Sequence, residues 1–177
     1  MQDLLNRLLC TSRHTACGNC HQCQLLRAGT HPDYLLISPE DSKQIVIDQI
    51  RGLVEWVAQT SQQGGQKICV ISPAHRMNVQ AANSLLKCLE EPPSATTIVL
   101  ISDVPNRLLP TIRSRCQHVI CHSPERKQAI RWLQRHHLSD MEPGLLLDIA
   151  NGVPLRAVEF IDSNYLGLRG RIAAVSY

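Results

Sequence analysis

The stretch from Lys67 to Ile101 restricts the fold more than any other part of the chain. It starts with an apolar run, KICVI at 67–71, and closes with a β-branched run, TTIVLI at 96–101. Between them, residues 78–91 have the spacing of an amphipathic helix, and two prolines stop it. A helix that joins two apolar strands is typical of a βαβ unit. The sequence therefore predicts an α/β fold built on a parallel sheet.

A loop with two arginines follows this unit. PTIRSRC at 110–116 presents Arg113 and Arg115, and the apolar, β-branched QHVIC at 117–121 predicts a further strand. A guanidinium is always charged and can donate two parallel hydrogen bonds to an anion. An arginine held in this loop is therefore expected to serve a group outside the strand.

Another strand and helix are expected before this unit. YLLI at 34–37 predicts a short strand, and the helix that follows is capped by Asp48 in this interpretation. Each of the two helices has an apolar stripe at steps of three and four residues. The stripe of the first consists of Ile50, Leu53, Val54 and Val57, and that of the second of Val79, Ala82, Leu86 and Leu89.

The chain is long enough for one good core and a small satellite domain, because 44% of its 177 residues are apolar. Aromatic residues make up only 3%, which favours a core of aliphatic side chains and argues against a surface for stacking bases. From Ser123 onward only helices are expected. We predict a partial α/β domain at 1–122, with a metal-binding module at 10–23, and a helical domain at 123–177.

Four cysteines near the start have the spacing of a metal site. Cys10, Cys17, Cys20 and Cys23 can supply four thiolates to one ion, and a closed set of this kind favours structural Zn²⁺ over a catalytic metal. His14 and His21 are alternative ligands if Cys10 lies too far away. The remaining cysteines are expected to pack inside the fold; they are Cys69, Cys88, Cys116 and Cys121.

The first residues carry charges among their leucines, and no apolar run approaches the length that spans a bilayer. We therefore expect no signal peptide, no membrane contact and a cytoplasmic location. Eight cysteines in such a chain indicate reduced thiols or metal ligands instead of disulfides.

Five stretches together resemble one family. They are the CxxCxxC cluster, AGTHPDYLLISP at 28–39, KICVI at 67–71, AANSLLKCLEEPP at 81–93 and RLLPTIRSRC at 107–116. In their order and spacing, over roughly residues 1–160, the chain resembles the delta-prime subunits of bacterial DNA polymerase III, which are clamp loader proteins of the AAA+ class. The resemblance implies a P-loop NTPase-like domain followed by a helical lid domain.

The resemblance also implies partners. It places the chain in a hetero-pentamer with motor subunits of the gamma or tau type and a delta subunit, in which delta prime is the stationary member. That assembly opens the sliding clamp and loads it onto primer-template DNA during replication. The chain would be an accessory subunit of a DNA-directed DNA polymerase, a nucleotidyltransferase complex, and not an enzyme by itself.

In such rings the arginine of the SRC loop reaches the γ-phosphate that the neighbouring subunit binds. Here that arginine finger is Arg115, with Ser114 and Cys116 positioning the loop. The alternative for Arg115 is an ordinary salt bridge at the start of a strand. For Arg113 a solvated loop charge is the favoured interpretation.

Productive ATP binding by this chain is not expected. GlyGlyGlnLys at 64–67 contains a lysine but precedes a strand, whereas a phosphate loop follows a strand and opens a helix. The strand at 67–71 leads into Ser-Pro-Ala without a carboxylate for Mg²⁺. Ser102 is expected to be a strand-end hydroxyl, and Arg156 lies one place beyond the position of a sensing arginine.

The resemblance further implies that a strand and phosphate-loop segment before Met1, and a collar domain after about Tyr165, lie outside this sequence. Two other functions stay open. One is an ATP-hydrolysing motor subunit whose phosphate loop is missing from this sequence. The other is a zinc-dependent nucleic-acid binding module.

Overall fold

The computed structural model describes residues 7–10, 12, 17–40, 43–93, 95–136 and 141–162. The chain separates into two compact units, Met1–His118 and Val119–Tyr177. The predicted division into domains at 1–122 and 123–177 stays a prediction. None of the helices in the described ranges is long and apolar enough to cross a membrane.

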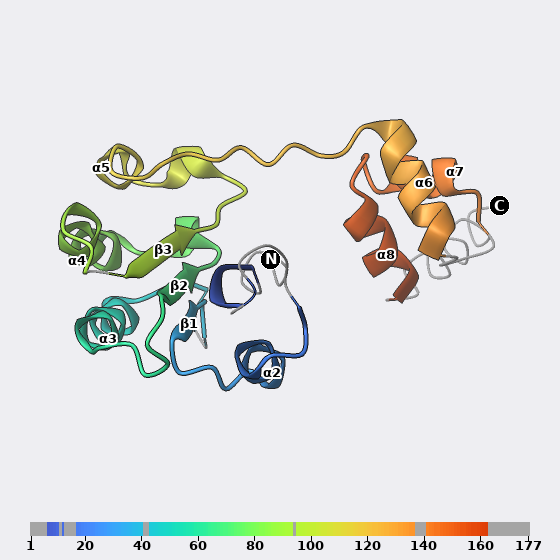
Figure 1. Ribbon diagram of the computed structural model, residues 1–177. Coiled ribbons are helices and arrows are strands. Elements are labelled where there is room, and N and C mark those ends of the chain that lie inside the picture. Colours follow the sequence, from blue (N-terminus) through green and yellow to red (C-terminus); the bar gives the residue numbers. More distant parts are fainter. Residues whose placement is uncertain are drawn as a thin grey trace. The chain divides into compact units, whose positions relative to one another are not determined.

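The first unit is built on a parallel sheet with the strand order β1-β2-β3 (Figure 1). In the central strand, Cys69 lies opposite Leu35 of β1 and Ile98 of β3. Every residue of β2 is buried, as expected for a parallel strand covered on both faces. The predicted α/β class with a parallel sheet is confirmed. The strands are β1 (Tyr34–Ile37), β2 (Lys67–Ile71) and β3 (Thr96–Leu100).

Helices α3 (Ile47–Ala58) and α4 (Val79–Glu90) cover one face of this sheet (Figure 1). Their buried side chains form the main core with alternate residues of β2, among them Cys69 and Ile71. The apolar cluster on the other face of the sheet is smaller. There Ile68 and Val70 pack against partly buried side chains. The remaining elements are α2 (His21–Ala28), η1 (Ala74–Arg76), η2 (Pro105–Arg107) and α5 (Pro110–Arg113).

The apolar stripe of α4 differs from the one expected. Val79, the first residue of the helix after the N-cap Asn78, is 65% exposed. The buried positions repeat as Ala81, Leu85 and Cys88, a stripe rotated by one residue, with Ala82 beside it. Leu86 and Leu89 lie at the edge of this stripe and are half-buried. Both stripes have helical spacing, so only packing against the sheet distinguishes them.

Three smaller expectations are wrong. Residues 117–121 form no strand, and Val119 and Ile120 are 80% and 75% exposed, since no described segment pairs with them. The N-cap of α3 is Val46, whose N–H donates to Oε1 of Gln49 at 3.1 Å, and Asp48 lies in the first turn. Cys121 is exposed instead of packed inside.

The described part of the second unit contains three short helices. They pack around a small core to which α6 and α7 contribute most of the buried side chains. An ion pair between Arg126 and Asp148 joins α6 to α7, and it raises the pKa of Arg126 and lowers that of Asp148. The helices are α6 (Arg126–His136), α7 (Pro143–Ile149) and α8 (Pro154–Asp162).

A buried carboxylate organises the loop that enters β2. Asp33 is 1% exposed, and its oxygens accept hydrogen bonds from the backbone N–H groups of Gln62 and Gln63 at 2.9 Å and from the Ser61 hydroxyl at 2.8 Å. Burial raises the pKa of this carboxyl, but these bonds outweigh burial and leave the pKa below its usual value. The ionised form is therefore the one that the fold stabilises.

Asp33→Asn is expected to lower the free energy of unfolding at pH 7 by about 2–3 kcal/mol, because an amide keeps only part of the charge-assisted bonds. A folded pKa below the unfolded one gives stability that is present above the unfolded pKa and lost as pH falls through the folded pKa. The difference between wild type and variant should shrink below about pH 4. Urea unfolding across pH measures it. The exposed Asp48→Asn is the control, with an expected change below about 0.5 kcal/mol.

Candidate functional site

The four cysteines of the predicted metal site lie together. The sulfur atoms of Cys10, Cys17, Cys20 and Cys23 are all within 4.8 Å of one another. Sγ of Cys10 lies 3.5 Å from that of Cys17 and 3.8 Å from that of Cys20. Zn–S bonds of about 2.3 Å give a tetrahedron with edges of about 3.8 Å, so the donor set fits Zn²⁺ in number, type and spacing.

The sulfurs come from the start of helix α2 and from the chain before it. Cys20 is the N-cap of α2 and Cys23 lies in its first turn, while Cys10 ends the preceding segment. Backbone N–H groups of Ser12 and Cys17 point at Sγ of Cys10, each at 3.4 Å. Among the described residues His21 is not part of the group, and His14 lies outside the described residues.

The protonation of this cluster is uneven. Burial raises the pKa of Cys23 to about 12, whereas backbone hydrogen bonds from Asn19 and Cys20 lower the pKa of Cys17. A buried thiol with such a pKa ionises only beside a cation, which is what a metal supplies. The cluster can therefore hold a metal ion, and Cys₄ coordination would leave no open position for catalysis.

The arginine loop lies elsewhere in the unit and contains a short helix, α5. Ile112 is fully buried and anchors it, and the Ser114 hydroxyl donates to the carbonyl oxygen of Thr111 at 3.1 Å. Cys116 is half-buried, and burial raises its pKa. Arg113 is also half-buried, and its carbonyl oxygen lies 2.7 Å from Nε2 of His118.

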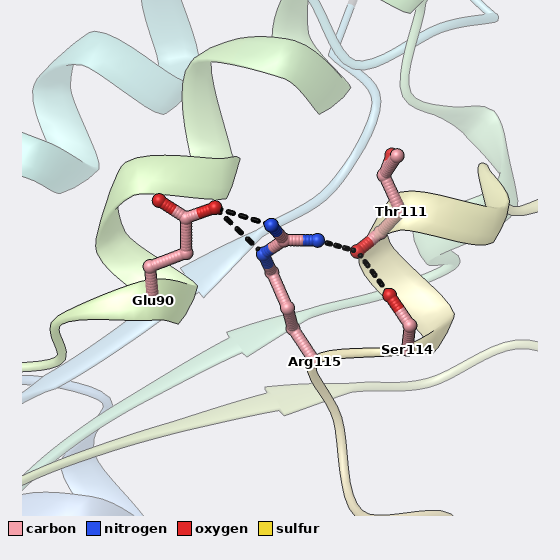
Figure 2. A network of polar contacts seen from close by, with 4 residues as sticks. All are labelled: Glu90, Thr111, Ser114 and Arg115. Atoms are coloured by element: carbon pink, nitrogen blue, oxygen red, sulfur yellow. Dashed lines mark hydrogen bonds and ion pairs between the residues drawn. The ribbon is translucent and has the colours of Figure 1, made fainter.

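The guanidinium of Arg115 bridges two elements (Figure 2). Its Nε and Nη2 lie 2.8 and 2.5 Å from Oε1 of Glu90, the last residue of α4. Its Nη1 donates to the carbonyl oxygen of Thr111 at 3.0 Å. The side chains of Arg115 and Glu90 are 35% and 48% exposed. A salt bridge is thus present, as the alternative interpretation expected, but no strand starts at this point.

A histidine that the sequence interpretation missed lies at the ends of the strands. His75, in η1 after β2, has its Nδ1 3.2 Å from the Ser102 hydroxyl and 3.1 Å from Oδ1 of Asp103, both after β3. Its side chain is 7% exposed. The carboxyl ends of adjacent parallel strands meet at one edge, and this rule could have paired His75 with Ser102. The contact joins two loops at the edge where ligands of open α/β sheets bind.

Lys67 is not available to a phosphate. It is 4% exposed, and its ammonium donates to the carbonyl oxygens of Trp56 and Gln59 at the end of α3. Nζ also lies 4.0 Å from the centroid of the Trp56 ring. A positive charge is stabilised at a helix C-terminus and over an indole face. The lysine of GlyGlyGlnLys therefore stabilises the end of a helix.

Comparisons with known proteins identify the family of this chain. The family model described as "DNA polymerase III, delta subunit" matches residues 1–125. Proteins named DNA polymerase III subunit delta' are similar to the chain. The one from Pseudomonas aeruginosa is 50% identical over 145 residues, covering 80% of this chain and 44% of that protein. The one from Haemophilus influenzae is 38% identical over 168 residues, covering 94% and 51%.

A solved structure is similar as well. It is a DNA polymerase III gamma subunit-related protein from Thermotoga maritima, with a TM-score of 0.57 and 28% identity, covering 77% of this chain and 47% of that one. The chain thus spans about half the length, or less, of the relatives named here. Since the family model covers more than half of the 177 residues, the chain belongs to the DNA polymerase III delta subunit family, and its curated relatives there are delta' subunits.

Proposed function

We propose that the protein acts in the clamp loader of DNA polymerase III as a subunit that hydrolyses no ATP itself and supplies Arg115 to ATP bound by a neighbouring motor subunit. The observation that carries this proposal is the contrast between two loops of one unit. The loop after α5 holds an arginine at the surface on two fixed acceptors. The loop after β2 offers Ser72, Pro73 and Ala74 where a nucleotide site needs carboxylates.

The chemistry proposed for Arg115 is electrostatic. During phosphoryl transfer negative charge is spread over the γ-phosphate oxygens, and a guanidinium brought in from a neighbour can stabilise it without a proton transfer. Arg115 is suited to this because it stays charged and is partly exposed. Ser114 shapes the loop through its bond to Thr111, and Cys116 is half-buried.

The partners follow from the same proposal. They are motor subunits of the gamma or tau type and a delta subunit, and through the complete assembly the sliding clamp and primer-template DNA. The names of the relatives and of the solved gamma-related structure support this set. The protein would work as an accessory subunit of the polymerase.

For the cysteine cluster we propose a structural Zn²⁺ held by Cys10, Cys17, Cys20 and Cys23. A bound zinc ion would supply four bonds that cross-link a loop with little core of its own. The sulfur spacing and the burial of Cys10 and Cys23 support a closed site. No step of ATP hydrolysis passes through this ion.

The experiment for the arginine finger uses the full-length protein in the assembled clamp loader. DNA-stimulated ATP hydrolysis is compared for wild type and Arg115→Ala. Hydrolysis unchanged by the substitution would show that Arg115 serves no neighbouring site. Tight binding and turnover of Mg·ATP by the full-length protein alone would show instead that it is a motor subunit. Steeply salt-dependent DNA binding by the protein alone would favour the nucleic-acid module.

A further inference from the structure

The guanidinium of Arg115 lies between two acceptors, Glu90 and Thr111 (Figure 2). The Nε–H and one Nη2–H form the edge that faces Glu90, and a single carboxylate oxygen, Oε1, accepts from both nitrogens (Figure 2). The carbonyl oxygen of Thr111 accepts from Nη1. These bonds use three of the five donors of a guanidinium. Within the described part of the chain, one N–H on each Nη atom is left for another acceptor.

The two acceptors come from separate elements of the same unit. Glu90 is the last residue of α4, and Thr111 lies in α5, whose neighbour Ile112 is fully buried. A long arginine side chain loses rotamer freedom when it is fixed. Here that loss occurs on folding, before any phosphate arrives. The guanidinium plane is thus preorganised, and preorganised charges stabilise a transition state better than mobile ones.

A carboxylate beside an arginine can act in two opposite ways. It can hold the guanidinium away from phosphate as an inhibitory latch, or it can fix the orientation while the guanidinium donates elsewhere. The geometry favours the second, because the Glu90 contacts occupy the Nε edge and a phosphate can be met by the Nη atoms without breaking them. The partly exposed pair also leaves the arginine accessible.

We propose that Glu90 is a positioning residue for the trans-acting Arg115, and that it raises the rate of hydrolysis at the neighbour's site by fixing the guanidinium plane. This inference rests on the proposed function of Arg115. It predicts that Glu90 acts only through Arg115 and affects the chemical step more than the binding of ATP. The neighbouring Glu91 is exposed and makes no hydrogen bond or ion pair with Arg115 in the described structure, so it provides a matched control.

The test uses the full-length protein in the assembled clamp loader and single-turnover hydrolysis of ATP. The kinetic phase that Arg115→Ala slows or removes is assigned to the site served by this protein. For Glu90→Gln, which keeps the size and loses the charge, we expect that phase to slow about tenfold with less than about a twofold change in KM for ATP. For Glu91→Gln we expect a change of less than about twofold. Thermal unfolding confirms that each variant is folded.

The double variant separates positioning from a general effect on structure. In the Arg115→Ala background, adding Glu90→Gln should change nothing, because its only target is gone. An unchanged or faster phase in Glu90→Gln, or an additive loss in the double variant, would overturn the positioning role while leaving the arginine finger intact. If Arg115→Ala itself affects no phase, the proposed function fails, and the role of Glu90 fails with it.

Discussion

Replacing Arg115 by alanine is expected to slow ATP hydrolysis at the neighbouring motor subunit by about 10³-fold at the site that it serves. The alanine removes a charge that would otherwise compensate the developing charge on the γ-phosphate oxygens. The variant should still fold, because the side chain is 35% exposed and its partner Glu90 is 48% exposed. The total rate of ATP hydrolysis by the complex falls only by the fraction that this one site contributes. Single-turnover kinetics, which separates the sites, is therefore the proper measurement.

Two variants make this prediction specific. Arg115→Lys keeps the charge but not the planar fork, and we expect it to recover only a small part of the lost rate. Arg113→Ala removes a charge two residues away in the same loop. We expect it to change the rate of hydrolysis by less than about threefold, because the loss of one partly exposed charge has a small energetic effect. Equal losses for Arg113→Ala and Arg115→Ala would mean that loop structure, and not the guanidinium of Arg115, determines the rate.

Removal of the zinc ion proposed for the four cysteines is expected to have the largest effect on structure. Structural Zn²⁺ sites contribute apparent binding energies of about 10–16 kcal/mol in small peptides, and that energy is also folding energy. Chelation, or Cys20→Ser, should therefore unfold the segment around α2 and lower the unfolding temperature of the first unit. Metal analysis of the reduced protein should find about one zinc per chain, and circular dichroism with a chelator measures the unfolding.

Cys121→Ser is the matched control for this experiment. Cys121 is exposed and lies outside the cluster, so its replacement should leave the zinc content and the unfolding temperature unchanged. A zinc content far below one per chain in the wild-type protein would contradict a Cys₄ site. Full zinc binding by Cys20→Ser would point to a different fourth ligand, such as His14 or His21.

Prediction from sequence succeeded where the local residue pattern fits only one kind of structure. The runs at 34–37, 67–71 and 96–101 became β1, β2 and β3 because apolar, β-branched residues bounded by turns suit buried strands. The cysteine spacing also led directly to a cluster, because four thiols within a few residues of one another can reach one ion in a short loop.

Prediction from sequence failed where the local residue pattern fits two different structures. Residues 117–121 include the β-branched pair Val119 and Ile120, but a strand exists only if a neighbour takes up its backbone hydrogen bonds. The stripe of α4 could begin at Val79 or at Ala81 with the same helical spacing, and the sheet selects the second. The contact of His75 with Ser102 joins residues 27 apart in sequence, so no local pattern contains it.

The parallel α/β unit, the group of four cysteines and the presence of Arg115 without a carboxylate directly after the strand at 67–71 follow from the amino-acid sequence. These depend on residue type and short spacing. Tertiary packing places Arg115 against Glu90 and Thr111, and among the described residues it leaves two N–H donors of the guanidinium without an acceptor. Glu90 is 25 residues away in the chain, and the packing of α4 beside α5, which no local spacing encodes, brings it there.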